Sequence, residues 1–310
     1  MSAYVLWRVI GLLPVLLIAV VLTFVATQFV PGDPIAVLLG NHAGDPVLEA
    51  RLRADYGLDQ PLVIQFLNYL KDIANGTFGM SFRFARMPVI DVIWTALTIT
   101  PILALTALFV AIPIGILLGT TAALHRGSKT DTGIILTLVA GISIPNFALA
   151  SFLVYLLAIR LNVVPVAGWG RLDQAVMPVM VLAVSPIAYI ARLTRTYMLE
   201  VFSQDYVRTA RAKGLRERHV VYRHALRNAL VPLLTSIGII FGGLLSGTFV
   251  VETIFNIPGL GSLAIQSIFA RDYPVTMTIV LLFTAFYAGI NLIVDLLYAA
   301  IDPRIRYTGR

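Results

Sequence analysis

The sequence predicts an all-α polytopic membrane protein with six transmembrane helices and both termini in the cytoplasm. Hydrophobic residues make up 58% of the 310 residues and charged residues only 13%, whereas a soluble domain carries about 25% charged residues. Long apolar runs recur along the chain, and about 20 such residues cross a bilayer as a helix. Lysine and arginine are concentrated on alternate connecting segments, as expected for a chain that crosses the membrane several times.

The spans are predicted from uncharged runs of sufficient length. They cover about residues 9–30, 97–124, 132–159, 174–191, 228–251 and 273–301. The first run lacks a small-residue cleavage site, so we expect a retained span rather than a signal peptide. Within the spans the sequence places a single ionisable residue, Asp295. Its position near the end of the last run favours pairing with a loop arginine over a role in ion coupling.

The distribution of basic residues predicts the orientation. With a cytoplasmic N-terminus, the cytoplasmic segments carry 15 Lys and Arg against 5 Asp and Glu, and the outer segments carry 8 against 10. Positively charged loops remain in the cytoplasm, so both ends are expected there. This bias also accounts for the net charge of +7, and we therefore expect no nucleic-acid partner.

The external region, residues 31–91, is expected to contain two short helices. Pro31-Gly32-Asp33-Pro34 ends the first span. Apolar residues four apart near Leu48–Tyr56, and a helical stripe over Leu62–Leu70, predict one helix each. These helices either shield the ends of the spans, or form a docking surface or lid. The sequence leaves both interpretations open.

The cytoplasmic loop, residues 192–227, contains the most informative segment of the chain. Asp205 is a good helix N-cap, Lys213 favours a helix C-terminus, and Gly214 suits the left-handed position beyond it. We therefore predict a short helix over 205–213 whose exposed faces combine small residues, an aromatic ring and cations. A second helical stretch, about 217–228, should lead into the fifth span. A capped helix is more structure than a positively charged membrane anchor requires.

Glycine pairs spaced by four residues predict close helix packing. They lie at Gly115/Gly119, Gly238/Gly242 and Gly243/Gly247. Two of these pairs belong to the fifth span, which we therefore expect at a helix–helix or subunit interface.

Catalytic signatures are absent from the sequence. It contains no cysteine, which excludes disulfides and thiolate chemistry. It also contains no H-E-x-x-H, G-x-S-x-G or Walker A pattern. All four histidines (His42, His125, His219 and His224) lie outside the predicted spans. A membrane enzyme is therefore the least favoured function, and no metal or catalytic site is expected.

Several motifs together resemble a known family. They are Asp205-Tyr206-Val207-Arg208-Thr209-Ala210, then Ala212-Lys213-Gly214-Leu215, His224-Ala225-Leu226-Arg227-Asn228-Ala229-Leu230, Tyr56-Gly57-Leu58-Asp59, Glu252-Thr253-Ile254-Phe255-Asn256-Ile257-Pro258-Gly259-Leu260-Gly261, and the ending Ile301-Asp302-Pro303-Arg304-Ile305-Arg306-Tyr307. The first two resemble the EAA loop of ABC-importer permeases. The similarity covers nearly the whole chain and is greatest to B-type subunits of the oligopeptide/dipeptide class, in their short, oligopeptide-permease-like form.

This resemblance implies a type I importer in the bacterial plasma (inner) membrane. The chain would pair with a homologous C-type permease, two cytoplasmic ABC ATPases and an external substrate-binding protein that delivers peptides. It would bind no cofactor, because ATP and Mg would be bound by the ATPases. The coupling helix would contact an ATPase through residues of one loop: Asp205, Tyr206, Arg208, Thr209, Ala210, Ala212, Lys213, Gly214 and Leu215.

Two features qualify the resemblance. The general EAA triplet is replaced by Arg208-Thr209-Ala210, which removes an acidic residue, and the loop between the third and fourth spans lacks the external insertion of some dipeptide permeases. Relatives in the family also import glutathione or nickel chelates, and the motifs do not separate these substrates. A secondary carrier or channel without ATPases is the alternative from a different class. Pro101, Pro113, Pro145 and Pro186 could supply the broken helices that such a carrier uses.

Overall fold

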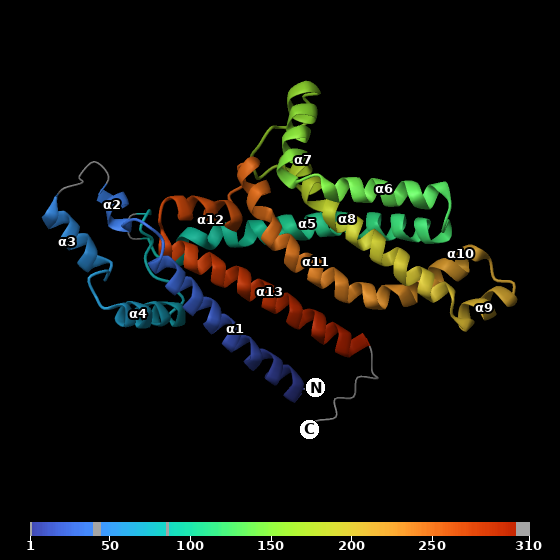
Figure 1. Ribbon diagram of the computed structural model, residues 1–310, viewed down its shortest axis with the longest axis horizontal. Coiled ribbons are helices and arrows are strands. Elements are labelled where there is room, and N and C mark those ends of the chain that lie inside the picture. Colours follow the sequence, from blue (N-terminus) through green and yellow to red (C-terminus); the bar gives the residue numbers. More distant parts are fainter. Residues whose placement is uncertain (1, 40–44, 85–86, 302–310) are drawn as a thin grey trace. The chain divides into compact units, whose positions relative to one another are not determined.

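The computed structural model describes residues 2–39, 45–84 and 87–301, and this part of the chain is almost entirely helical. His42 and the terminal motif after Ile301 lie outside the described residues. The chain divides into two compact units, one formed by Met1–Thr100 with Pro258–Ala288 and the other by Pro101–Ile257 with Gly289–Arg310. Each unit is described by itself below, with the element labels of Figure 1.

Helices long and apolar enough to cross a membrane occur in the number that the sequence predicts. Five are continuous: Arg8–Gln28, Val89–Leu124, Leu172–Phe202, Glu217–Ile254 and Tyr273–Leu296. Lys129–Ser143 and Asn146–Arg160 pass the same criterion as a pair and give up to six spans. The prediction of an all-helical, multi-pass membrane protein is confirmed.

The first unit contains the N-terminal helix and the external region. Its helices are α1 (Ser2–Gln28), α2 (Pro34–Leu39), α3 (Pro46–Asp55), α4 (Leu62–Ala74), the beginning of α5 (Val89–Leu124), α12 (Leu260–Phe269) and the beginning of α13 (Tyr273–Ile301). Helices α3 and α4 coincide with the two predicted amphipathic patterns. The side chain of Asp45 caps α3 by accepting from the backbone N–H groups of Val47 and Leu48 at 3.0 and 3.1 Å.

Apolar side chains hold α4 against the long helices of this unit. Val20, Tyr69, Met277 and Leu281 are buried together, and the rings of Phe24 and Phe66 meet edge to face with centroids 5.1 Å apart. Of the apolar stripe that predicts α4, Phe66 and Leu70 pack on α1 and α13, whereas Leu62, Val63 and Leu67 are exposed.

A buried carboxylate joins two distant segments of the first unit. Asp272, fully buried, lies just before α13. It accepts from the Ser81 hydroxyl and from the backbone N–H groups of Phe82 and Arg83, the latter at 3.1 and 3.2 Å. These bonds satisfy the buried charge and fix the segment that leads into α5.

The second unit contains the other long helices and the cytoplasmic loop. Its elements are the remainder of α5, α6 (Lys129–Ser143), α7 (Asn146–Leu153), the π-helical η2 (Val154–Arg160), α8 (Leu172–Phe202), α9 (Asp205–Ala212), α10 (Glu217–His219), the π-helical η3 (Val220–Ala225), α11 (Leu226–Ile254) and the end of α13. The last three helical segments of the loop and fifth span run without interruption from Glu217 to Ile254. A helical stretch leading into the fifth span is thus observed as predicted.

Of the four prolines that the sequence analysis considers as helix breakers, only Pro145 lies at a break. At Pro145 the chain bends by 96° between α6 and α7, so residues 132–159 do not form one straight helix. Pro101 and Pro113 lie inside α5, and Pro186 inside α8. In the described residues these three prolines therefore do not create the broken half-helices considered for a secondary carrier.

Glycine allows α5 and α8 to approach closely. A Cβ atom built on Gly115 would lie 2.7 Å from Ile190 Cγ2, and one built on Gly119 would collide with the carbonyl oxygen of Ala191. The Gly115/Gly119 pair is therefore a packing motif, as predicted. In α11, Gly238 meets Val294, whereas Gly243 and Gly247 face open space.

Candidate functional site

The predicted coupling helix is present as α9, between α8 and the helical run that contains α11 (Figure 1). Its N-cap is Gln204, with an extended backbone and no side-chain cap hydrogen bond. Asp205 is instead the first helical residue, so the prediction of an Asp205 cap is wrong by one position. Asp205 still favours the helix start, because a negative charge in the first turn complements the helix dipole.

The C-terminus of α9 ends as the sequence predicts. Gly214 has φ +73°, the left-handed conformation that glycine adopts without strain. Its N–H donates to the Arg211 carbonyl at 2.9 Å, and the Leu215 N–H donates to the Ala210 carbonyl at 3.4 Å. This pair of bonds is a Schellman motif, which satisfies two of the last carbonyls and fixes the direction in which the chain leaves.

One face of α9 is buried within the chain itself. Val207 and Ala210, spaced three apart, pack with Val220 and against the side chains of Val201 and Phe202. Ala210 is only 6% exposed. The expectation that Ala210 lies on an exposed face is therefore incorrect, since its small size serves packing against η3 and the end of α8.

The other predicted coupling residues form the exposed face and ends of α9. They are Asp205, Tyr206, Arg208, Thr209, Ala212, Lys213, Gly214 and Leu215. Arg208 approaches Asp205 at 3.6 Å, but both side chains are largely exposed, and such a pair contributes little to stability. Partial burial raises the pKa of the Tyr206 phenol. The exposed face thus offers cations, small groups and one aromatic ring to a partner.

An ion pair that was not predicted from the sequence joins α9 to the beginning of α10. Arg211 Nη2 lies 2.7 Å from Glu217 Oε1, and its guanidinium also covers the Phe202 ring at 5.5 Å. Hydrogen bonding to Glu217 raises the pKa of Arg211. The apolar spacing of Val207 and Ala210 is a sequence signal for the buried face of α9. The contact between Arg211 and Phe202 depends on tertiary structure and has no such signal.

The loop is joined to the ends of three long helices. Met198 of α8, Ala123 of α5, Val221 and Ala225 of η3 and Ala229 of α11 form one buried cluster. Helix α9 has no residue in this cluster, and its own buried residues pack on the end of α8 and on η3.

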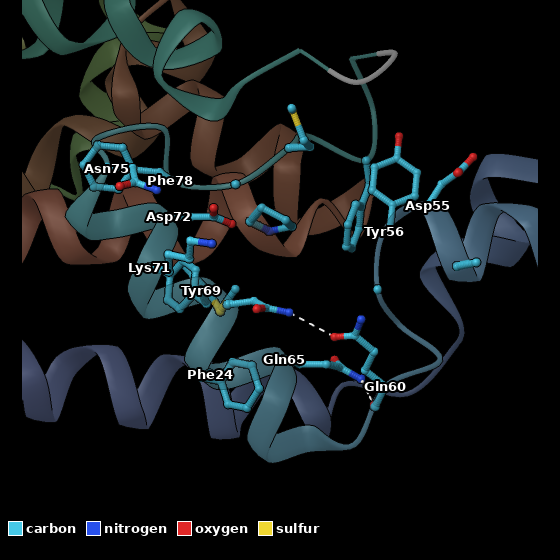
Figure 2. A pocket seen from close by; sticks show the side chains of 18 residues that line it. Phe24, Asp55, Tyr56, Gln60, Gln65, Tyr69, Lys71, Asp72, Asn75 and Phe78 are labelled. Carbon is cyan, nitrogen blue, oxygen red and sulfur yellow. Dashed lines mark hydrogen bonds between the residues drawn. The ribbon is translucent and has the colours of Figure 1, made fainter.

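On the external region, the first unit contains a polar hollow of about 540 Å³ (Figure 2). Amides form one side: Gln65 Nε2 donates to the Gln60 carbonyl at 2.7 Å, and Asn68 Nδ2 donates to the Gln60 side-chain oxygen at 2.9 Å. Lys71 and Asp72 bring opposite charges, and burial raises the pKa of Asp72. Asp55 also lines the hollow, which therefore contains two acids, one lysine and several aromatic side chains beside its amides.

The structure gives the positions of the remaining predicted features. Asp295 lies in α13 and is half-buried; its predicted pairing with a loop arginine stays a prediction. His219 and His224 have ring centroids 5.6 Å apart. No group of three or more metal-ligating side chains occurs in residues 2–39, 45–84 and 87–301.

The fold is that of an all-helical membrane protein in which the short helix α9 precedes the run Glu217–Ile254. A chain of the MetNI methionine ABC transporter in an inward-facing conformation shares the fold, with a TM-score of 0.56 and 20% identity over 69% of this chain and 96% of that chain. The chain belongs to the family of binding-protein-dependent transport system inner membrane components, whose model matches residues 111–307. The N-terminal model of the same membrane components matches residues 1–105.

Full-length relatives are permease subunits. A putative peptide transport system permease protein of Brucella abortus (strain 2308) is 42% identical over 99% of this chain and 100% of its own length. The glutathione transport system permease protein GsiC of Shigella flexneri serotype 5b (strain 8401) is also 42% identical, with the same coverage. The chain is therefore a transport subunit of this family and not an enzyme.

Proposed function

We propose that this chain is the B-type permease of an ATP-driven importer that translocates peptides, and that α9 couples it to an ATPase. Its partners would be a homologous C-type permease, two cytoplasmic ATPases that bind ATP and Mg, and an external substrate-binding protein. The permease relatives named for peptides support the substrate class. Glutathione, itself a tripeptide, is the second candidate, because a glutathione permease is equally similar.

A single observation carries the coupling role. The buried face of α9 fixes it to the end of α8 and to η3, while its remaining faces stay exposed. An element that transmits motion must be rigid with respect to the part that it moves and accessible to the part that drives it. Closure of the ATPases on ATP would displace α9, and the attached helices would then open the pathway to one side or the other.

A cross-linking experiment tests this role. The chain has no cysteine, so Thr209→Cys on the exposed face of α9 introduces a single thiol into the otherwise native protein. We expect it to cross-link to an ATPase subunit in the assembled importer, with a yield that changes when ATP binds. Thr77→Cys, on the external region, is the matched control and should give no ATPase adduct.

The substrate is tested separately, by the uptake of labelled di-, tri- and oligopeptides and of glutathione into vesicles that contain the assembled importer and its binding protein. Saturable, ATP-dependent uptake of peptides supports the proposal. ATP-dependent uptake of glutathione alone would assign the second candidate. Transport by the purified chain without any ATPase would contradict the proposal and support a secondary carrier.

A further inference from the structure

A second surface of the cytoplasmic loop has a composition that coupling does not require. Six residues of the run Glu217–Ile254 line two adjoining hollows and so share one surface. They are His219, Tyr222, Arg223, Leu226, Arg227 and Leu230. We call this face the 219–230 stripe. Its first turns are polar and cationic, and its last turns, at the start of the fifth apolar run, contain leucine.

Most of the stripe lies on a different side of the helical run from α9 and α8. Val220 packs on Val207 and Ala210 of α9, and Val221 and Ala225 pack with Met198 of α8. Tyr222 and Arg223 are exposed. Leu226 borders the α8 cluster and is half-buried, and the exposed residues of the stripe are separate from the face that holds α9.

Two hollows lie along the stripe and share Tyr222 and Arg223. The first, about 390 Å³, is lined by Arg216, Arg218, His219 and the two shared residues. The second, about 520 Å³, adds Leu226, Arg227 and Leu230. Together they extend over roughly 15 Å of helix. One end of this surface is cationic and the other partly apolar.

The cations of the first hollow are not neutralised by any other residue within 2–39, 45–84 and 87–301. Among the described residues, no ion pair to Arg216, Arg218 or Arg223 occurs. The nearest acid in sequence, Glu217, is engaged by Arg211 at 2.7 Å. Converging unpaired guanidinium groups are a favourable environment for phosphate oxygens, which they bind through short, charge-assisted hydrogen bonds.

We propose that the 219–230 stripe binds an anionic phospholipid of the cytoplasmic leaflet. The phosphate would occupy the hollow lined by Arg216, Arg218 and Arg223, and an acyl chain would follow Leu226 and Leu230 toward the membrane. Free phosphate satisfies the cationic hollow equally well, but it leaves the adjoining leucines without a ligand. The change from cationic to apolar along one face matches the change from headgroup to chain in a lipid. This inference does not depend on which substrate the importer carries.

The experiment titrates phosphatidylglycerol in detergent micelles against the full chain and follows the midpoint of thermal unfolding, with phosphatidylcholine and inorganic phosphate as separate titrants. The test variant is Arg218→Gln/Arg223→Gln. The matched control, Arg208→Gln/Lys213→Gln, removes the same charge from α9. A third variant, Leu230→Ser, alters only the apolar end. Native mass spectrometry of the assembled importer then counts the bound phosphatidylglycerol with and without the ATPase subunits.

We expect phosphatidylglycerol, and not phosphatidylcholine, to raise the midpoint. The test variant should weaken its half-saturation roughly 30-fold, about fivefold for each arginine near an anionic headgroup, and Leu230→Ser should weaken it as well. The control should stay within about threefold of the wild type, as expected for exposed charges. The proposal would be overturned if the control variant weakened phosphatidylglycerol binding as much as the test variant does. It would also be overturned if inorganic phosphate raised the midpoint as far as phosphatidylglycerol does, or if binding of the ATPases released the lipid.

Discussion

Arg195 of α8 donates two parallel hydrogen bonds to Asp131 of α6, from Nε to Oδ1 at 2.8 Å and from Nη2 to Oδ2 at 2.7 Å. The Gly127 N–H donates a third bond to the same carboxylate at 2.9 Å. The Asp131 side chain is only 4% exposed. The pair therefore fixes the beginning of α6 to α8, close to the cytoplasmic loop that carries α9.

Loss of Arg195 should be more damaging than loss of the whole pair. Arg195→Met leaves a buried carboxylate with one hydrogen bond, at a cost of about 3–5 kcal/mol. We expect a clearly lower midpoint of thermal unfolding in detergent. Arg195→Met/Asp131→Leu, which removes both charges, should recover part of this loss. A double variant less stable than the single one would show that the pair has a favourable net energy beyond charge compensation.

Two alanines of α9 should respond differently to the same substitution. Ala210→Leu adds volume to the packed contact with Val207 and Val220, so we expect a destabilisation of about 1–3 kcal/mol. Ala212→Leu lies on the exposed side and should leave stability within about 0.5 kcal/mol. If α9 seats against an ATPase, Ala212→Leu should nevertheless reduce transport-coupled ATP hydrolysis. Unfolding midpoints and ATPase rates of both variants separate the two effects.

Two helical glycines provide a matched test of close packing. Gly119→Ala places a methyl group against the backbone of α8 at Ala191 and should destabilise the protein by about 1–3 kcal/mol. Gly133→Ala, inside α6, meets nothing within 4 Å and should be neutral or stabilising by up to about 1 kcal/mol, because alanine favours a helix. Similar shifts of the unfolding midpoint in both variants would contradict the packing role of Gly119.

Alkaline pH should weaken the external region through one phenol. Burial raises the pKa of Tyr69 to about 12, above the ordinary value near 10. Because the unfolded chain then loses this proton first, the stability is fully present below about pH 10 and falls between about pH 10 and 12. The loss reaches on the order of 2–3 kcal/mol. Tyr69→Phe should lack this component, and unfolding midpoints of both proteins across that range measure it. Parallel curves would refute the assignment.

Local sequence signals predicted the existence and ends of α9 well. Gly214 marks the end because only its own backbone conformation is involved. The start was displaced by one residue, since Gln204 adopts the cap conformation without a side-chain bond. The spacing of Val207 and Ala210 indicates a buried face, but the residues that cover Ala210, Phe202 and Val220, come from other elements and could not be deduced from α9 alone.

For the long helices, too, local features could be predicted from the sequence and tertiary effects could not. Apolar length predicted their positions, and the Gly115/Gly119 spacing predicted a close contact that the structure places against Ile190 and Ala191. Proline was less informative, because a proline in an apolar helix is tolerated when neighbouring groups compensate. The bend at Pro145 and the continuity of α5 through Pro101 cannot be distinguished from sequence.

The carboxylate of Asp272 has a mechanical consequence for the outside of the protein. It ties the Ser81–Arg83 segment, and with it the entry into α5, to the first turn of α13 by three hydrogen bonds at a site without water access. Separating these segments would leave a buried carboxyl group without its hydrogen-bond partners, which is costly. Two spin labels, one near Ser81–Arg83 and one near Asp272, should therefore keep the same separation throughout the transport cycle, whichever way the pathway faces.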